Sequence, residues 1–274
     1  MLSPTSPSTP FLLGVVLAAL IGLLVLRALR KDRREYRMFK RYRSTLKRQR
    51  MYRKWLLDSL VTFGGSSVVV LALVWQHIPL FLDDVNGYGW VAQARMAFAD
   101  SAGLAAGVIA GILVVVVVGM VLVIFAARGV DAVPAIGDIQ ALLPRNRAEL
   151  RYGAALSINA GIVEEALFRL AVPVLVFGVT GSSALAIAGS LALFGALHVY
   201  QGLAGVIGSA VIGVLLMVLY LATGSILAAM AVHALIDLRS LVLIPIVVYK
   251  AHRQPVKPTS PSPPGSPGLS VPLL

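Results

Sequence analysis

Cysteine is absent from the 274-residue chain, and charged residues are scarce. The absence of cysteine excludes disulfides, thiolate zinc ligands, a cysteine nucleophile and cysteine-linked lipid anchors within this sequence. Charged residues make up only 13% of the chain, whereas soluble domains carry about 25%. Because 58% of the residues are hydrophobic, too little polar surface remains to cover a water-soluble globule. We therefore expect a protein whose main solvent is the lipid bilayer.

Long apolar runs are abundant, and a helix needs about 20 such residues to cross the hydrocarbon core. The sequence predicts seven spans, at residues 11–29, 55–75, 102–127, 153–179, 184–200, 206–222 and 226–249. Glycine- and serine-containing turns at 181–183 and 223–225 are short, so the helices that they join should be antiparallel neighbours. The expected fold class is all-α, a polytopic transmembrane helical bundle of about seven spans with its functional core in the C-terminal four.

Acidic residues are half as numerous as basic ones, 12 against 24, and residues 27–54 hold much of the positive charge. By the positive-inside rule this basic stretch should lie in the cytoplasm. The N-terminus and a loop at 83–100 should then be outside, and residues 128–151 and the C-terminal tail inside. Aromatic residues among the basic ones would also suit nucleic acid, but beside a span we expect anionic lipids as the partner and no nucleic acid. The composition, rich in Ala, Val and Arg, favours a bacterial plasma membrane as the location.

Ionisable residues inside spans are expensive, at about 2.5–3.5 kcal/mol each. In this chain they concentrate in the fourth, fifth and seventh spans. The residues are Glu164, Glu165, Arg169, His198, His233 and Asp237. A polar network that only locks helices together needs fewer and milder groups, so this clustering indicates a functional site.

Helical geometry separates the two adjacent glutamates. Glu165 and Arg169 are four residues apart and should form an ion pair on one face. Glu164 points about 100° away from Glu165 and is left free for chemistry. Arg239 is expected to line the same polar cleft.

Three motifs in these spans resemble those of the CPBP family, the CAAX protease and bacteriocin-processing (Abi) family. Residues 164–169 read EEALFR and match EExxxR, residues 194–198 read FGALH and match FxxxH, and residues 233–237 read HALID and are similar to HxxxN/D. The resemblance covers about residues 143–244. It implies an intramembrane endopeptidase in which Glu164 and His198 activate a water, His233 and Asp237 hold the oxyanion, and Glu165 and Arg169 are the second Glu and the Arg.

The chain departs from the family pattern at two positions. Leu170 follows the Arg where the family often has Gly, which would narrow the cavity. Asp237 stands where Asn is more common, and an ionised carboxylate cannot donate to an oxyanion. Asp237 would therefore be protonated, orient His233, or bind a metal.

The resemblance divides the chain into four parts. Residues 1–54 would be an N-out anchor helix with a basic cytoplasmic segment, and residues 55–142 two additional transmembrane helices. Residues 143–249 would form the protease domain, and residues 250–274, rich in Pro and Ser, a disordered cytoplasmic tail.

The chemistry leaves several alternatives. We favour hydrolysis by general-base catalysis without a cofactor, acting on a membrane protein or a lipid-anchored peptide. A zinc-dependent version would use Glu, His, His and Asp ligands, although the sequence has no HExxH motif. A non-catalytic membrane scaffold or immunity protein is a third reading. A proton-coupled transporter would predict an inverted repeat, which the sequence does not show.

Overall fold

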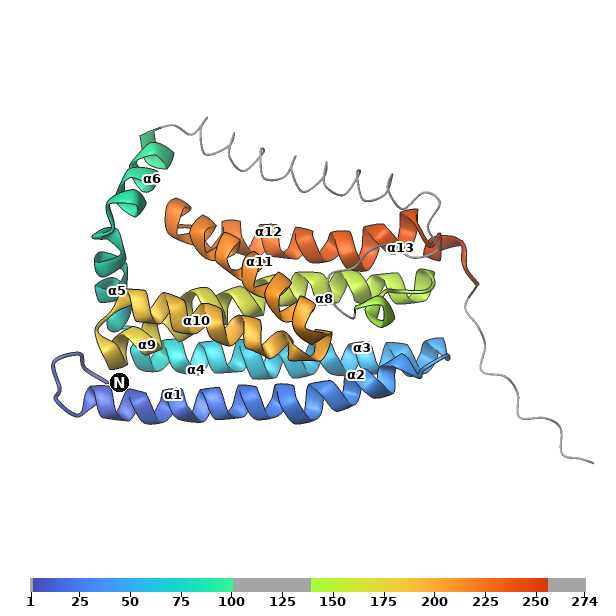
Figure 1. Cartoon of the computed structure of the whole chain (residues 1–274), viewed down its shortest axis with the longest axis horizontal. Helices are drawn as coiled ribbons and strands as arrows, with labels where there is room; N and C mark the ends of the chain where they lie inside the picture. The colour runs from blue at the N-terminus through green and yellow to red at the C-terminus, as the bar shows by residue number, and fades with distance from the viewer. Residues whose placement is uncertain (1, 101–138, 256–274) are drawn as a thin grey trace, which may run out of the picture.

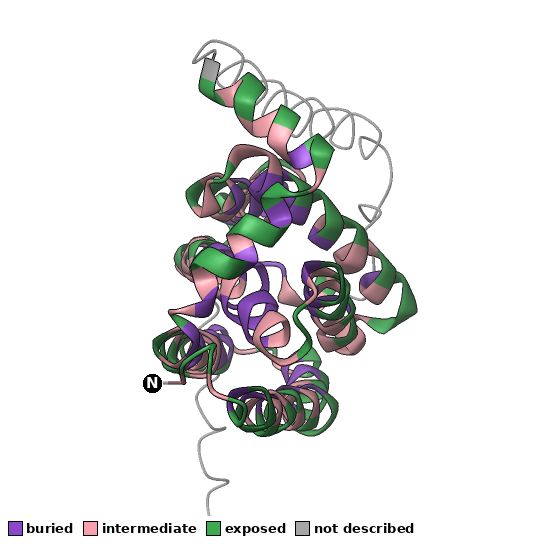
Figure 2. Cartoon of the chain, turned by 90° about the vertical axis from the view of Figure 1, so that its left-hand side faces the viewer, coloured by how far each residue is buried: buried purple, intermediate pink, exposed green. Residues whose placement is uncertain are grey.

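The computed structural model describes residues 2–100 and 139–255, and within these residues all regular secondary structure is helical. Most helices run side by side along one direction, while α5 and α6 stand across one end of the bundle (Figure 1). Buried residues face the interior, and the outer surfaces are mostly exposed (Figure 2). Several of these outward side chains are large and apolar: Leu203 is 76% exposed, and Val61 and Leu227 are each 71% exposed. Such a surface suits lipid rather than water.

Two long rods form what we call the N-terminal hairpin. The first consists of α1 (Thr9–Leu26), the π-helical turn η1 (Arg27–Asp32) and α2 (Arg33–Lys40). The second returns beside it as α3 (Thr45–Ser59), the π-helical turn η2 (Leu60–Gly64) and α4 (Gly65–Val74). The basic segment of the sequence is therefore the helical closed end of this hairpin.

Residues expected to form an outer loop are instead helical, so that part of the prediction was wrong. The chain forms α5 (His77–Asn86) and α6 (Gly89–Asp100). Phe81, Val85 and Val91 are fully buried, and the Phe81 ring meets Phe177 edge to face at 5.7 Å. These buried apolar residues alternate with acidic and polar ones, so the composition of the segment did not indicate helices.

The C-terminal half contains the remaining long helices. The first rod comprises α8 (Arg147–Glu165), the π-helical turn η4 (Ala166–Ala171) and α9 (Val172–Thr180), preceded by the short η3 (Gln140–Leu142). Next come α10 (Ser183–Leu197), the 3₁₀ turn η5 (His198–Gln201) and α11 (Gly202–Thr223). The last rod is α12 (Ile226–Leu238), the π-helical turn η6 (Arg239–Leu243) and α13 (Ile244–Val247), followed by η7 (Ala251–Arg253).

The two turns expected from sequence are present. Gly181 and Gly224 adopt φ values of 67° and 66°, the left-handed conformation that glycine tolerates best. The following serines, Ser182 and Ser225, cap the next helices by accepting from the backbone amides of residues 185 and 228. These turns reverse the chain between α9 and α10 and between α11 and α12.

Within the described residues, four helices are long and apolar enough to cross a membrane: Thr9–Lys40, Thr45–Val74, Ser183–Thr223 and Ile226–Val247. The third of these changes direction at Gly202, whose φ is 77°, so α10 and α11 are separate limbs that diverge from η5 (Figure 1). The chain is therefore an integral membrane helical bundle. The expected count of seven spans is not confirmed, and the span at 102–127 and most of the tail at 250–274 lie outside the described residues.

A buried polar cluster attaches the N-terminal hairpin to the start of α8. Arg48 is fully buried, and its Nε pairs with Glu149 Oε2 at 3.0 Å. Its other nitrogens donate to the carbonyls of Ala141 and Leu143 and to the Tyr52 hydroxyl. This arginine of the basic segment thus serves the fold rather than the membrane surface.

Candidate active site

Glu165 and Arg169 form the ion pair expected from their spacing. Glu165 Oε2 lies 3.1 Å from Arg169 Nε, and both side chains are fully buried. Glu165 ends α8, and Arg169 lies in the π-helical turn η4. π-Helical turns occur frequently at functional sites.

The same carboxylate also binds His233 of α12. His233 Nδ1 lies 2.8 Å from Glu165 Oε1, so Glu165 bridges Arg169 and His233 with its two oxygens. The close approach of α8 and α12 allows this contact. A Cβ on Gly161 would lie 2.8 Å from the Ala234 nitrogen, which leaves no room for a side chain there.

Phe194 of α10, the first residue of the FxxxH motif, packs against this group. The Arg169 guanidinium lies 4.9 Å from the centre of the Phe194 ring, a cation–π arrangement. The same ring lies 4.9 Å from the His198 ring and 6.3 Å from the His233 ring. All three sequence motifs therefore meet around one buried glutamate, one arginine and one phenylalanine.

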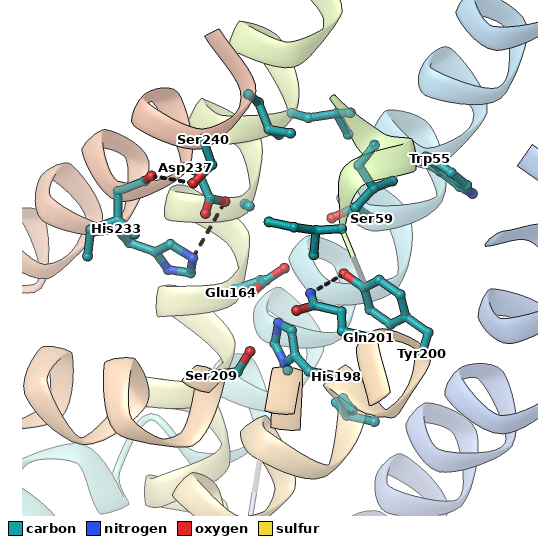
Figure 3. A pocket seen from close by; sticks show the side chains of 18 of the residues that line it. Trp55, Ser59, Glu164, His198, Tyr200, Gln201, Ser209, His233, Asp237 and Ser240 are labelled. Atoms are coloured by element: carbon teal, nitrogen blue, oxygen red, sulfur yellow. Dashed lines mark hydrogen bonds and ion pairs between the residues drawn. The ribbon is translucent and has the colours of Figure 1, made fainter. Parts of the chain in front are cut away.

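Glu164 has a different environment from Glu165. Its side chain lines a cavity of about 390 Å³ together with His198, His233 and Asp237. Figure 3 shows Glu164, His198 and His233 directed from three different helices toward this common space. Glu164 makes no side-chain hydrogen bond or ion pair with another described residue, so its carboxylate is available to a water or a substrate.

His198 is held in one tautomer. Its Nδ1 lies 2.8 Å from the carbonyl oxygen of Phe194. A carbonyl can only accept, so Nδ1 carries the proton and donates, and a neutral His198 keeps a lone pair on Nε2. That nitrogen is the one able to accept a hydrogen bond in the cavity.

Asp237 lies near His233 but does not hydrogen-bond to it. Asp237 Oδ2 and His233 Nε2 are 3.8 Å apart, beyond ordinary hydrogen-bond length. The Asp237 side chain is 33% exposed, and it lines the cavity. Arg239, in η6, lines the same cavity, as the sequence predicted.

Carboxylates and imidazoles, the groups that bind zinc in proteins, line the cavity. Across residues 2–100 and 139–255, no group of three or more His, Cys, Asp or Glu side chains is arranged to hold a metal ion. The donor types suit zinc, and no step of the chemistry is assigned to a metal.

The cavity has a wall that the sequence motifs did not indicate. Tyr36, Trp55 and Ser59 of the N-terminal hairpin line it, as do Tyr200 and Gln201, which follow His198 (Figure 3). No local pattern marks the hairpin residues, because they reach the site only through tertiary packing. Tyr200 and Gln201 are polar residues two and three positions after a motif histidine in an apolar region, a local signal that the sequence does contain.

Comparison with known proteins agrees with the motifs. Residues 146–239 match the family model described as type II CAAX prenyl endopeptidase Rce1-like, and this segment contains all three motifs. No curated protein and no solved structure matches the chain. The matched description points to a protease.

Proposed function

Through residues 146–239 the chain belongs to the CPBP family, and we propose that it is an intramembrane endopeptidase. It would hydrolyse a peptide bond of a membrane-associated substrate with a water activated by Glu164 and His198. The observation that carries this proposal is that two adjacent glutamates have different surroundings. Glu165 is bound by Arg169 and His233, whereas Glu164 faces the cavity beside His198.

The proposed reaction begins with a water between Glu164 and His198. The Glu164 carboxylate takes one proton from the water, while His198 Nε2 orients it by accepting a hydrogen bond. The resulting hydroxide oxygen forms a bond to the carbonyl carbon of the substrate peptide. The carbonyl π-electrons move to oxygen, which gives a tetrahedral oxyanion.

Collapse of this intermediate completes hydrolysis. The carbon–nitrogen bond breaks, the oxyanion electrons re-form the carbonyl, and Glu164 returns its proton to the leaving amine. His233 binds the Glu165 carboxylate through Nδ1 and lies beside Asp237, and the proposed step uses its doubly protonated form. Its Nε2–H would stabilise the oxyanion, and the enclosed helical bundle strengthens that interaction by excluding bulk water.

The position of the cavity suggests the side from which substrates enter. His198 begins η5 directly after α10, and this turn contacts η1 and α2 of the basic end of the hairpin. With the N-terminus outside, this end is cytoplasmic, so the substrate would be a membrane protein or lipid-anchored peptide of the cytoplasmic leaflet. Exposed basic residues of the hairpin would contact anionic lipids there. The bacterial plasma membrane is the proposed location.

Replacing Glu164 tests the proposal directly. We expect purified full-length Glu164→Gln to cleave a farnesylated CAAX peptide at least about 100-fold more slowly than wild type, because the amide cannot accept the water's proton. Asp83→Asn is the matched control, since Asp83 is an exposed carboxylate of α5 outside the cavity and should leave the rate unchanged. In cells, membrane-protein fragments should disappear with Glu164→Gln and persist with Asp83→Asn.

The alternative functions predict different results for this variant and for metal removal. A scaffold or immunity protein would retain its cellular activity in Glu164→Gln at equal expression. The zinc-dependent version would lose activity on chelation and recover it with added zinc, and would contain stoichiometric metal. If the proposed metal-free mechanism holds, the wild-type protein should keep full activity after chelation.

A further inference from the structure

The motif residues that line the cavity offer few hydrogen-bond donors for an oxyanion. Asp237 occupies the position where an amide would donate, and an ionised carboxylate only accepts. One nitrogen of His233 is already committed to Glu165 at 2.8 Å. Oxyanion stabilisation depends on donors placed in advance around the developing charge. His233 Nε2 alone would leave this site incomplete.

The 3₁₀ turn η5 brings two further polar side chains to the cavity beside His198. In a 3₁₀ turn, residues three apart lie on the same face, so His198 and Gln201 share a face. Gly202, with φ of 77°, ends the turn and starts α11 in a new direction. Tyr200 and Gln201 both line the cavity that contains Glu164 (Figure 3).

The Tyr200 hydroxyl has an uncommitted proton. Gln201 Nε2 donates to the Tyr200 oxygen at 2.8 Å. A phenol can accept hydrogen bonds and donate one. Among the described residues, the Tyr200 hydroxyl donates to no acceptor, so its proton is available to a group that enters the cavity.

The Tyr200 ring is held from two sides. It stacks on the His198 ring with a centroid distance of 6.1 Å and an interplanar angle of 29°. The Tyr36 ring of the N-terminal hairpin meets it edge to face at 5.6 Å. With its oxygen fixed by Gln201, the phenol has the prior orientation that an oxyanion donor requires.

We propose that the Tyr200 hydroxyl, oriented by Gln201, is a catalytic residue that donates a hydrogen bond to the oxyanion and supplies the donor that Asp237 cannot. This inference rests on the proposed hydrolysis. It gives the N-terminal hairpin a part in catalysis, since Tyr36 packs on the donor's ring. It also explains how a chain with Asp at position 237 retains two oxyanion donors, Tyr200 and His233.

The test uses the purified full-length protein and a farnesylated CAAX peptide, with kcat and KM measured separately. Tyr200→Phe removes only the hydroxyl and should lower kcat about 100- to 1,000-fold with KM nearly unchanged, because the contact forms only in the transition state. Tyr220→Phe removes the hydroxyl of another buried tyrosine, outside the cavity, and should match wild type. A kcat for Tyr200→Phe equal to that of wild type would overturn the inference.

A second variant keeps the phenol but changes its partner. Gln201→Glu places an acceptor where Gln201 donates, so the Tyr200 proton is drawn away from the cavity. We expect a kcat loss comparable to that of Tyr200→Phe, although the hydroxyl is intact. Full activity in this variant would contradict the proposed donor.

Placing an amide at position 237 distinguishes a donor role of Tyr200 from a purely structural role. In an Asp237→Asn background, Tyr200→Phe should cost at least about tenfold less in kcat, because the new amide donates in its place. An equal loss in both backgrounds would indicate that Tyr200 acts only on packing. Retained activity in Glu164→Gln would contradict the proposed hydrolysis itself. An inactive Glu164→Gln together with a fully active Tyr200→Phe would contradict only the role of Tyr200.

Discussion

At the scale of single residues, the centre of the site is the fully buried carboxylate of Glu165. It faces the Arg169 guanidinium at 3.1 Å and the His233 imidazole at 2.8 Å. Buried charges in a bundle are tolerable only when they are paired. The adjacent Glu164 faces the cavity instead, so neighbouring glutamates should respond differently to the same substitution.

Glu165→Gln should destabilise the protein, whereas Glu164→Gln should not. Removing the Glu165 charge leaves Arg169 buried and uncompensated, and breaking a buried pair costs about 3–5 kcal/mol. We expect a clear drop in the thermal unfolding midpoint of Glu165→Gln in detergent, measured beside Glu164→Gln and wild type. Equal midpoints for the two variants would show that the Glu165 pairs do not hold the fold.

At the scale of elements, contacts between α3 and α8 connect the hairpin to the segment that carries the motifs. Arg48 contributes an ion pair to Glu149 and three further hydrogen bonds from inside this contact. The aromatic rings of Phe39 and Tyr52 lie against its guanidinium at 4.2 and 5.5 Å. The hairpin therefore holds its side of the cavity, including Tyr36 and Trp55, in a fixed position.

Arg48→Ala should loosen this connection. It leaves Glu149 buried without its cation, with an expected loss of about 3–5 kcal/mol, and it frees the hairpin wall of the cavity. The unfolding midpoint and the peptidase rate should both fall. Arg37→Ala, which removes an exposed arginine of the same hairpin, should change neither, and a similar effect of the two variants would contradict a specific role for Arg48.

At the scale of the whole molecule, the two ends of the bundle differ in the residues that they carry. The closed end of the hairpin carries the basic residues, and α5 with α6 lies across the other end. By the positive-inside rule we propose that the basic end lies in the cytoplasm. Arg27, Asp32 and Tyr36 of this end line the cavity, so the orientation would also decide which leaflet presents the substrate.

The absence of cysteine makes the orientation directly measurable. Arg43→Cys, in the hairpin turn, should react with a membrane-impermeant maleimide only after cells are permeabilised. Asp83→Cys, in α5, should react in intact cells. Both positions are exposed, and the unmodified chain provides the unlabelled control. The reverse labelling pattern would place the site toward the outer leaflet.

The sequence by itself determined the membrane environment, the helical class and the short-range pairs. Hydropathy indicated a bilayer, and the i,i+4 spacing of Glu165 and Arg169 predicted their ion pair, because helix geometry alone brings such residues together. The turns at Gly181 and Gly224 were likewise local, since glycine tolerates positive φ. The motifs also indicated which spans carry the site.

Tertiary structure decided what lies between helices. The bond from His233 to Glu165 depends on the close packing of α8 and α12 at Gly161, and the Tyr36 and Trp55 wall depends on docking of the hairpin. The helices α5 and α6 form where charge suggested a loop. Contacts between residues distant in sequence follow from the packing of complete helix surfaces, which local spacing and composition do not specify.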